Sequence, residues 1–164
     1  AQLMQSLLEL CQGAARAEFL AGEILLSEGT TSGQLYVLRD GELEVLRGNT
    51  QVAIIEEPGA LFGEMSVLLQ RPHTATVRTL TPCALYVFDD AASFLRSKPD
   101  IAFHVARLLA GRLNAATSYL ADIKRQFEGR ADHLGMVGEV LDTLMHNQEK
   151  EFSPGAERER DPRL

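Results

Sequence analysis

The chain of 164 residues is long enough for one globular domain with a helical extension, and 45% hydrophobic residues can build its core. A formal net charge of −7 argues against nonspecific binding to nucleic acid. No apolar run approaches the length of a membrane span, and Cys11 and Cys83 are expected to be free thiols, which together favour a cytoplasmic protein.

Short apolar runs separated by turn residues fill the first half of the chain, after a predicted amphipathic helix over residues 2–11. Asp40-Gly41 and Gly48-Asn49 are strong hairpin signals, because these residue types tolerate positive φ. Since no helix separates the strands, the pattern predicts an antiparallel, jelly-roll-like β-roll of about eight strands. Seven strands are assigned to residues 18–20, 24–26, 35–38, 43–46, 52–55, 75–79 and 84–88.

Helices are predicted for the second half of the chain. Asp90 can cap a short helix over residues 91–97, and Pro99 can begin a long helix that ends near Phe127. Apolar residues recur along the long helix in steps of four and three, which predicts a heptad seam and a homodimer. The alternative is a helix buried entirely within one monomer. The seam consists of Ala102, Ala106, Leu109, Leu113, Ala116, Leu120, Ile123 and Phe127.

The chain is expected to divide into a main domain over residues 1–128, one further helix within 129–150, and a disordered tail over 151–164. The helix carries apolar residues on one face, and the tail is charged and contains Pro and Gly. Neither part contains a basic recognition helix, so direct binding to DNA is not expected.

The stretch Pro58–Val77 contains the most informative pattern in the chain. A Pro-Gly turn leads through Phe62-Gly63-Glu64 into one apolar helical turn, which places a helix N-terminus at a glycine. The free N–H groups and the positive dipole end of such a terminus suit an anion such as phosphate. The carboxylate of Glu64 would instead accept a hydrogen bond from a hydroxyl, such as a ribose 2′-OH. A phosphate site beside a hydroxyl acceptor indicates a nucleotide.

The order Phe62-Gly63-Glu64 and then Pro72-x-x-Ala75-Thr76-Val77 resembles the phosphate-binding cassette of cyclic-nucleotide-binding domains. Such domains occur in catabolite-activator and Fnr-like transcription factors, in cyclic-nucleotide-dependent kinases and in gated channels. The resemblance covers roughly residues 18–120 and implies cAMP or cGMP as ligand. The binding residues it implies are Phe62, Gly63, Glu64, Met65, Ser66, Pro72, His73, Thr74, Ala75, Thr117 and Ser118.

Within this set the resemblance assigns the backbone amides after Gly63 to the phosphate and Glu64 to the ribose. Thr74 would donate to the phosphate or meet a guanine amine, and its alternative is an ordinary strand residue. Thr117 and Ser118 would reach the purine, and their alternative is a polar helix face.

His73 stands where the family pattern has an arginine. An arginine offers a permanent charge and two parallel hydrogen bonds, whereas histidine offers one donor and titrates near neutral pH. Losing the arginine would cost about 1.5–3 kcal/mol of binding. The sequence therefore predicts weak, pH-dependent binding, and the alternative is an exposed loop histidine in a pocket that binds nothing.

The sequence contains no nucleophile–base pair, no P-loop and no cluster of histidines, so neither an enzyme nor a metal site is expected. The expected function is a cyclic-nucleotide sensor without a helix-turn-helix domain, acting through contacts with a downstream protein that the sequence does not identify. One alternative is an interaction module that has lost its ligand. Another is a fragment of a larger regulator or channel.

Overall fold

The computed structural model describes residues 2–127 and 131–146. It divides into two compact units, residues 1–108 and 109–164. The domain boundaries expected after residues 128 and 150 stay predictions, and the tail predicted for 151–164 lies outside the described residues.

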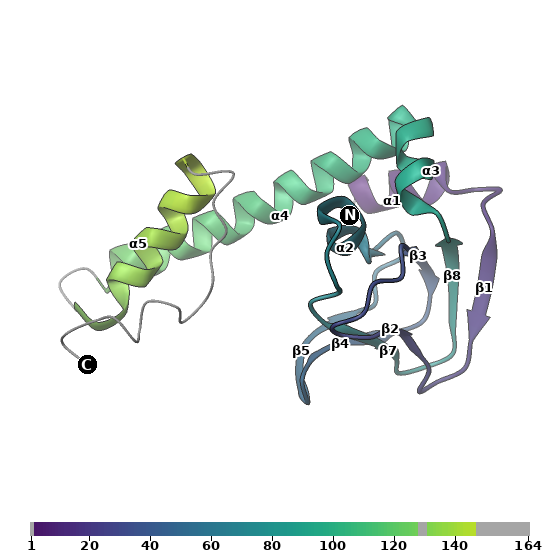
Figure 1. The fold of residues 1–164 in the computed structure, drawn as a ribbon, viewed down its shortest axis with the longest axis horizontal. Coiled ribbons are helices and arrows are strands. Elements are labelled where there is room, and N and C mark those ends of the chain that lie inside the picture. Colours follow the sequence, from purple (N-terminus) through teal and green to yellow (C-terminus); the bar gives the residue numbers. More distant parts are fainter. Residues whose placement is uncertain (1, 128–130, 147–164) are drawn as a thin grey trace. The chain divides into compact units, whose positions relative to one another are not determined.

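The helices and strands alternate little along the chain, as Figure 1 shows. In chain order they are α1 (Gln2–Leu10), β1 (Arg16–Phe19), β2 (Ile24–Leu26), β3 (Leu35–Asp40), β4 (Leu43–Arg47), β5 (Thr50–Ile55), β6 (Leu61–Phe62), α2 (Glu64–Leu69), β7 (Thr76–Thr79), β8 (Cys83–Phe88), α3 (Ala91–Ser97), α4 (Pro99–Gln126) and α5 (Ala131–His146).

Two four-stranded antiparallel sheets form the first unit, in the orders β1-β8-β3-β6 and β2-β7-β4-β5. This arrangement confirms the predicted β-roll. The seven strands assigned from the sequence are all present with small differences at their ends. The eighth, β6, has two residues, which is too short for an alternating pattern to reveal.

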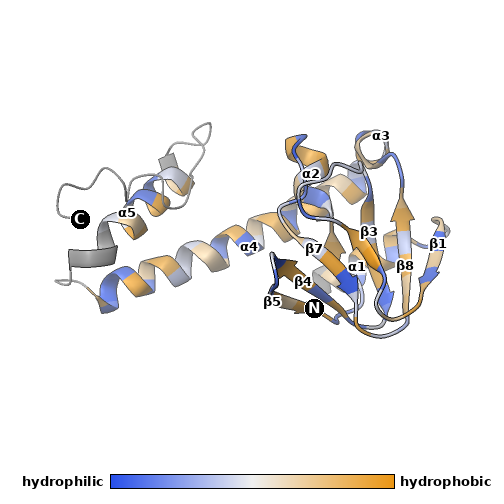
Figure 2. Ribbon diagram, turned by 60° about the horizontal axis from the view of Figure 1, so that its bottom comes forward, coloured by the Kyte–Doolittle hydropathy of each residue, from blue (hydrophilic) through white to orange (hydrophobic). Residues whose placement is uncertain are grey.

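The core lies between the inward faces of the two sheets. Leu38, Leu43 and Leu85 are completely buried there, and Tyr36 and Phe62 stack with ring centroids 5.2 Å apart. Figure 2 shows that hydrophobic residues dominate β3 and β8, the central strands of the first sheet. These strands read as nearly continuous apolar runs because both of their faces are covered.

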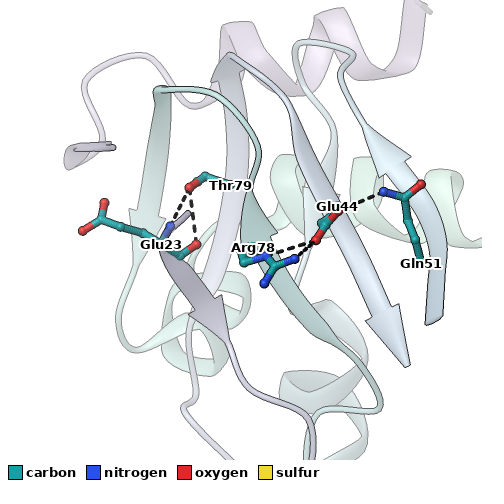
Figure 3. A network of polar contacts seen from close by, with 5 residues as sticks. All are labelled: Glu23, Glu44, Gln51, Arg78 and Thr79. Atoms are coloured by element: carbon teal, nitrogen blue, oxygen red, sulfur yellow. Dashed lines mark hydrogen bonds and ion pairs between the residues drawn. The ribbon is translucent and has the colours of Figure 1, made fainter. Parts of the chain in front are cut away.

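Strand β7, which begins within the last residues of the predicted cassette, is held from both sides by polar side chains (Figure 3). On one side, Arg78 Nε and Gln51 Nε2 donate to the carboxylate of Glu44 at 3.0 and 2.9 Å. These hydrogen bonds from Gln51 and Arg78 hold the pKa of Glu44 below its usual value. On the other side, Thr79 Oγ1 accepts from the Glu23 amide at 2.9 Å. The strand is therefore joined to β2, β4 and β5.

The helices after the roll follow the sequence pattern. Asp90 accepts a hydrogen bond from the Ser93 amide at 3.4 Å, as its predicted role as N-cap of α3 requires. Ile101 and Val105, at the start of α4, are buried in the first unit. In the second unit the seam residue Leu113 is 44% exposed. Among the described residues, no helix has the length and apolarity needed to cross a membrane.

Candidate functional site

The turn into α2 requires a glycine for two reasons. Gly63 adopts φ +92°, a left-handed conformation that glycine reaches without strain. A Cβ at this position would also lie 2.6 Å from the carbonyl oxygen of Gln34. The loop before β3 is therefore packed directly against the first residue of the cassette. The position of Gly63 before α2 agrees with the arrangement expected from the sequence.

Helix α2 presents its two polar side chains to the protein and three of its apolar side chains to solvent. Glu64 and Ser66 are each 5% exposed, whereas Met65, Leu68 and Leu69 are 51%, 49% and 61% exposed. The Ser66 hydroxyl donates to the Arg71 carbonyl, and the Arg71 amide donates back to the Ser66 carbonyl at 3.2 Å. The Ser66 side chain thus closes the end of α2, and only its backbone amide is available for the predicted contact with a phosphate.

His73 is buried, with 5% of its surface exposed, so it is not the exposed loop residue that the alternative interpretation requires. Its amide donates to the Thr30 carbonyl, and its carbonyl accepts from the Gly29 amide, both at 2.8 Å. Its Nε2 lies 2.8 Å from the Ser32 hydroxyl. These three contacts attach the end of the cassette to the loop between β2 and β3.

The burial of His73 lowers its pKa, because an apolar environment disfavours the charged imidazolium. The surroundings of His73 therefore do not favour the charged imidazole that was expected beside a phosphate. At neutral pH the structure favours a neutral imidazole that shares a hydrogen bond with Ser32.

Arg47 lies beside the cassette, although no motif in the sequence includes it. Its Nε donates to the carbonyl of Thr74, the residue after His73, at 3.1 Å. The contact depends on the pairing of β4 with β7, and no local sequence signal reports that register. Ser32 was missed for the same reason, since its contact with His73 joins residues 41 positions apart.

The inward face of β4 becomes more exposed toward Arg47. Val45 pairs with Ala53, and both lie on the inward side because Leu43, two residues before Val45, belongs to the core. Leu43 is completely buried, Val45 is half-buried and Ala53 is exposed. Burial therefore decreases along the inward face toward Arg47.

The remaining predicted residues lie at the end of the cassette or in the second unit. Pro72 and Thr74 are exposed and Ala75 is half-buried, all at the end of the cassette in the first unit. Thr117 and Ser118 belong to the second unit, so their contact with a purine stays a prediction. Cavities of about 400 and 450 Å³ lie next to α1 and include no cassette residue. The described residues contain no group of three or more potential metal ligands.

Comparison with known proteins adds to this geometry. The family model of the cyclic nucleotide-binding domain matches residues 16–96, which include the whole cassette. Residues 16–96 belong to the cyclic nucleotide-binding domain family. This confirms the resemblance seen at Phe62-Gly63-Glu64 and Pro72.

Among curated proteins, the chain is 29% identical over 112 residues to a CRP-like cAMP-activated global transcriptional regulator of Mycobacterium tuberculosis, covering 65% of this chain and 50% of the relative. It is 30% identical over 133 residues to the potassium channel KOR1 of Oryza sativa, covering 79% of this chain and 15% of the channel. The chain therefore spans half the length of the mycobacterial regulator and less of the channel.

Among solved structures, the chain is similar to the N-terminal domain of a transcriptional regulator from Streptomyces coelicolor, with a TM-score of 0.51 and 26% identity. That match covers 71% of this chain and 86% of the other. A cyclic nucleotide-binding domain from Methylobacillus flagellatus, at 22% identity and a TM-score of 0.56 over 68% of each chain, shares the fold.

Proposed function

We propose that this cyclic nucleotide-binding domain senses cAMP or cGMP and regulates a partner through protein contacts. The observation that carries the proposal is the burial of the Glu64 carboxylate directly after the Gly63 turn, within the part of the chain that matches the family. A carboxylate has several acceptor sites, so Glu64 can accept a hydrogen bond from a ligand in addition to its contacts within the protein. A ribose 2′-OH would donate this hydrogen bond, and the amides at the start of α2 would face the phosphate.

We infer from the net charge and the helices that the domain acts on a partner protein rather than on DNA. A net charge of −7 disfavours direct contact with DNA. The heptad seam of α4 would join two copies, and a ligand that binds one arrangement of the helices more tightly would shift the population toward it. Thr117 and Ser118 would then contact the purine. Two buried free thiols, Cys11 and Cys83, agree with a cytoplasmic location.

A second candidate function is an interaction module that binds no nucleotide. The burial and lowered pKa of His73 favour it, because they leave the family's arginine position without a positive charge. A cyclic phosphate would lose about 1.5–3 kcal/mol of binding there. The third interpretation, that this chain is part of a longer regulator or channel, is compatible with either function.

Isothermal titration of the full chain with cAMP and cGMP, at about pH 6 and about pH 8, distinguishes the two functions. We expect binding of at least one nucleotide with similar affinity at both pH values, since burial lowers the pKa of His73 and disfavours its charged form. Glu64→Gln should weaken binding by about ten-fold or more, because the charged acceptor is lost. Glu18→Gln, at an exposed position of β1, is the matched control and should bind normally.

Absence of heat at both pH values would favour the interaction module. His73→Arg then tests the reason, because it restores the residue of the family pattern. If His73→Arg gains binding, the site lacks only its cation; if it stays silent, the site is defective elsewhere. Affinity that rises toward pH 6 would contradict a neutral His73.

A further inference from the structure

Arg47 is the last residue of β4 and lies beside the end of the cassette. In the pairing of β4 with β7, Val45 lies opposite Val77 and Leu46 opposite Thr76. Because side chains alternate along a strand, Arg47 is on the same face as Val45, the inward face. Along this face Leu43 is completely buried, Val45 is half-buried and Arg47 is exposed.

The guanidinium of Arg47 is held against the cassette but is only partly used. Its Nε donates to the Thr74 carbonyl at 3.1 Å, which fixes the plane of the group next to residues 73–75. Guanidinium has five N–H donors, and this bond uses one of them. Within the described residues, Arg47 forms no ion pair with a carboxylate.

The carboxylate of Glu28 is bonded to the turn after Arg47 and not to the guanidinium of Arg47. Glu28 Oε2 accepts from the Gly48 amide at 3.3 Å, and the Glu28 amide donates to Thr76 Oγ1 at 3.0 Å. Glu28 thus anchors the turn after Arg47 and forms no ion pair with it. The charge of Arg47 therefore remains available to a ligand.

We infer that Arg47 supplies the positive charge for the ligand's phosphate that His73 does not supply. This inference rests on the proposed function, because it assumes that a phosphate binds at the cassette. The permanent charge of Arg47 and its forked N–H groups suit phosphate oxygens, whereas His73 is neutral and directed to Ser32. The cation that recognises the ligand comes from the sheet rather than from the residue after Pro72.

The test compares a ligand with and without a phosphate. The full chain and its Arg47→Ala variant are titrated with cAMP and with adenosine, which shares the base and the ribose but has no phosphate. We expect Arg47→Ala to weaken cAMP by about ten-fold or more and to leave adenosine unchanged. The affinity of the variant for cAMP should also depend less on salt concentration, since one charge has been removed.

Arg39→Ala is the matched control. Arg39 lies on β3 with its guanidinium carbon 5.2 Å from the ring centroid of Tyr86, and it has no contact with the cassette. It should bind both ligands normally. Arg47→Lys keeps the charge but loses the fork, and it should bind cAMP more tightly than Arg47→Ala does. Thermal unfolding of each variant shows whether the fold is intact.

The outcomes separate this inference from the proposed function. If the unmodified chain binds cAMP and Arg47→Ala binds it equally well, the inference is wrong and the proposed function stands. If Arg47→Ala weakens cAMP and adenosine by the same factor, Arg47 only positions the Thr74 strand, which also overturns the inference. If the unmodified chain binds cGMP but not cAMP, the same comparison is made with cGMP and guanosine. If it binds neither cyclic nucleotide, both proposals fail.

Discussion

At the scale of single residues, burial decides what His73 can do. Its side chain contacts Ser32 and its backbone is hydrogen-bonded to Thr30 and Gly29. These contacts are with the loop between β2 and β3 and not with solvent. The same burial lowers its pKa and makes a charged imidazolium costly. Histidine at this position therefore differs from the family's arginine in two ways: it has fewer hydrogen-bond donors, and its burial disfavours the charged form.

The lowered pKa of His73 predicts how stability responds to acid. Between the pKa of the folded state and about 6.5 in the unfolded chain, the unfolded chain binds more protons, so the free energy of unfolding falls as the pH falls through this window. Above it, both states are neutral and His73 has no effect. Urea unfolding at about pH 7.5 and about pH 5.5 should show a larger loss for the unmodified chain than for His73→Gln. Parallel losses would contradict this.

At the scale of elements, the start of α2 depends on contact with the loop before β3. Gly63 combines a positive φ with the close approach of the Gln34 carbonyl, and Gln34 in turn accepts from the Tyr36 hydroxyl at 2.8 Å and donates to Asp89 at 3.0 Å. The orientation of the first α2 amides therefore depends on packing between segments about 30 residues apart, as well as on the local turn.

Gly63→Ala should destabilise the roll more than a change of backbone preference alone would explain. The left-handed conformation costs about 1–2 kcal/mol for alanine, and the contact with the Gln34 carbonyl adds to it. Gly22→Ala is the control, because Gly22 has φ +85° and open space around its Cβ position. Urea unfolding should give a larger loss for Gly63→Ala, by about 1 kcal/mol or more. Equal losses would show that the loop before β3 can move away at little cost.

At the scale of the whole molecule, the seam of α4 is the surface through which we propose that two copies of the chain associate. The seam residues Leu113 and Phe127 are 44% and 43% exposed, which leaves apolar surface along the helix for another chain. Ile101 and Val105 of the same helix are buried in the first unit. The long helix thus has one buried face near its start and one partly exposed seam.

Leu113→Asp should dissociate the proposed dimer, because each copy would place a carboxylate in an apolar seam. Asn114→Asp adds the same charge at the next, exposed position outside the seam and should leave the dimer intact. Sedimentation equilibrium of the three full-length proteins measures the mass of each. A monomeric unmodified chain, or identical masses for both variants, would refute dimerisation through this seam.

The sequence by itself determined the β-roll, the helix order and the position of the cassette. Alternating apolar residues, Asp-Gly turns and the Gly63-Glu64 pair are local patterns. They can be recognised in the sequence because they depend on the backbone preferences and burial of residues that are neighbours in the chain. Strand β6 was not predicted because its two residues are too few to show an alternating pattern.

Only the tertiary structure decided which charges surround the cassette. The burial of His73 depends on Ser32, 41 residues away, and the contact of Arg47 with Thr74 depends on the register of β4 against β7. Each joins segments that are distant in the chain, and a shift of one residue in the pairing would turn Arg47 to the opposite face. Register is a property of the packed sheet, which is why the position of the available cation could not be read from the order of residues.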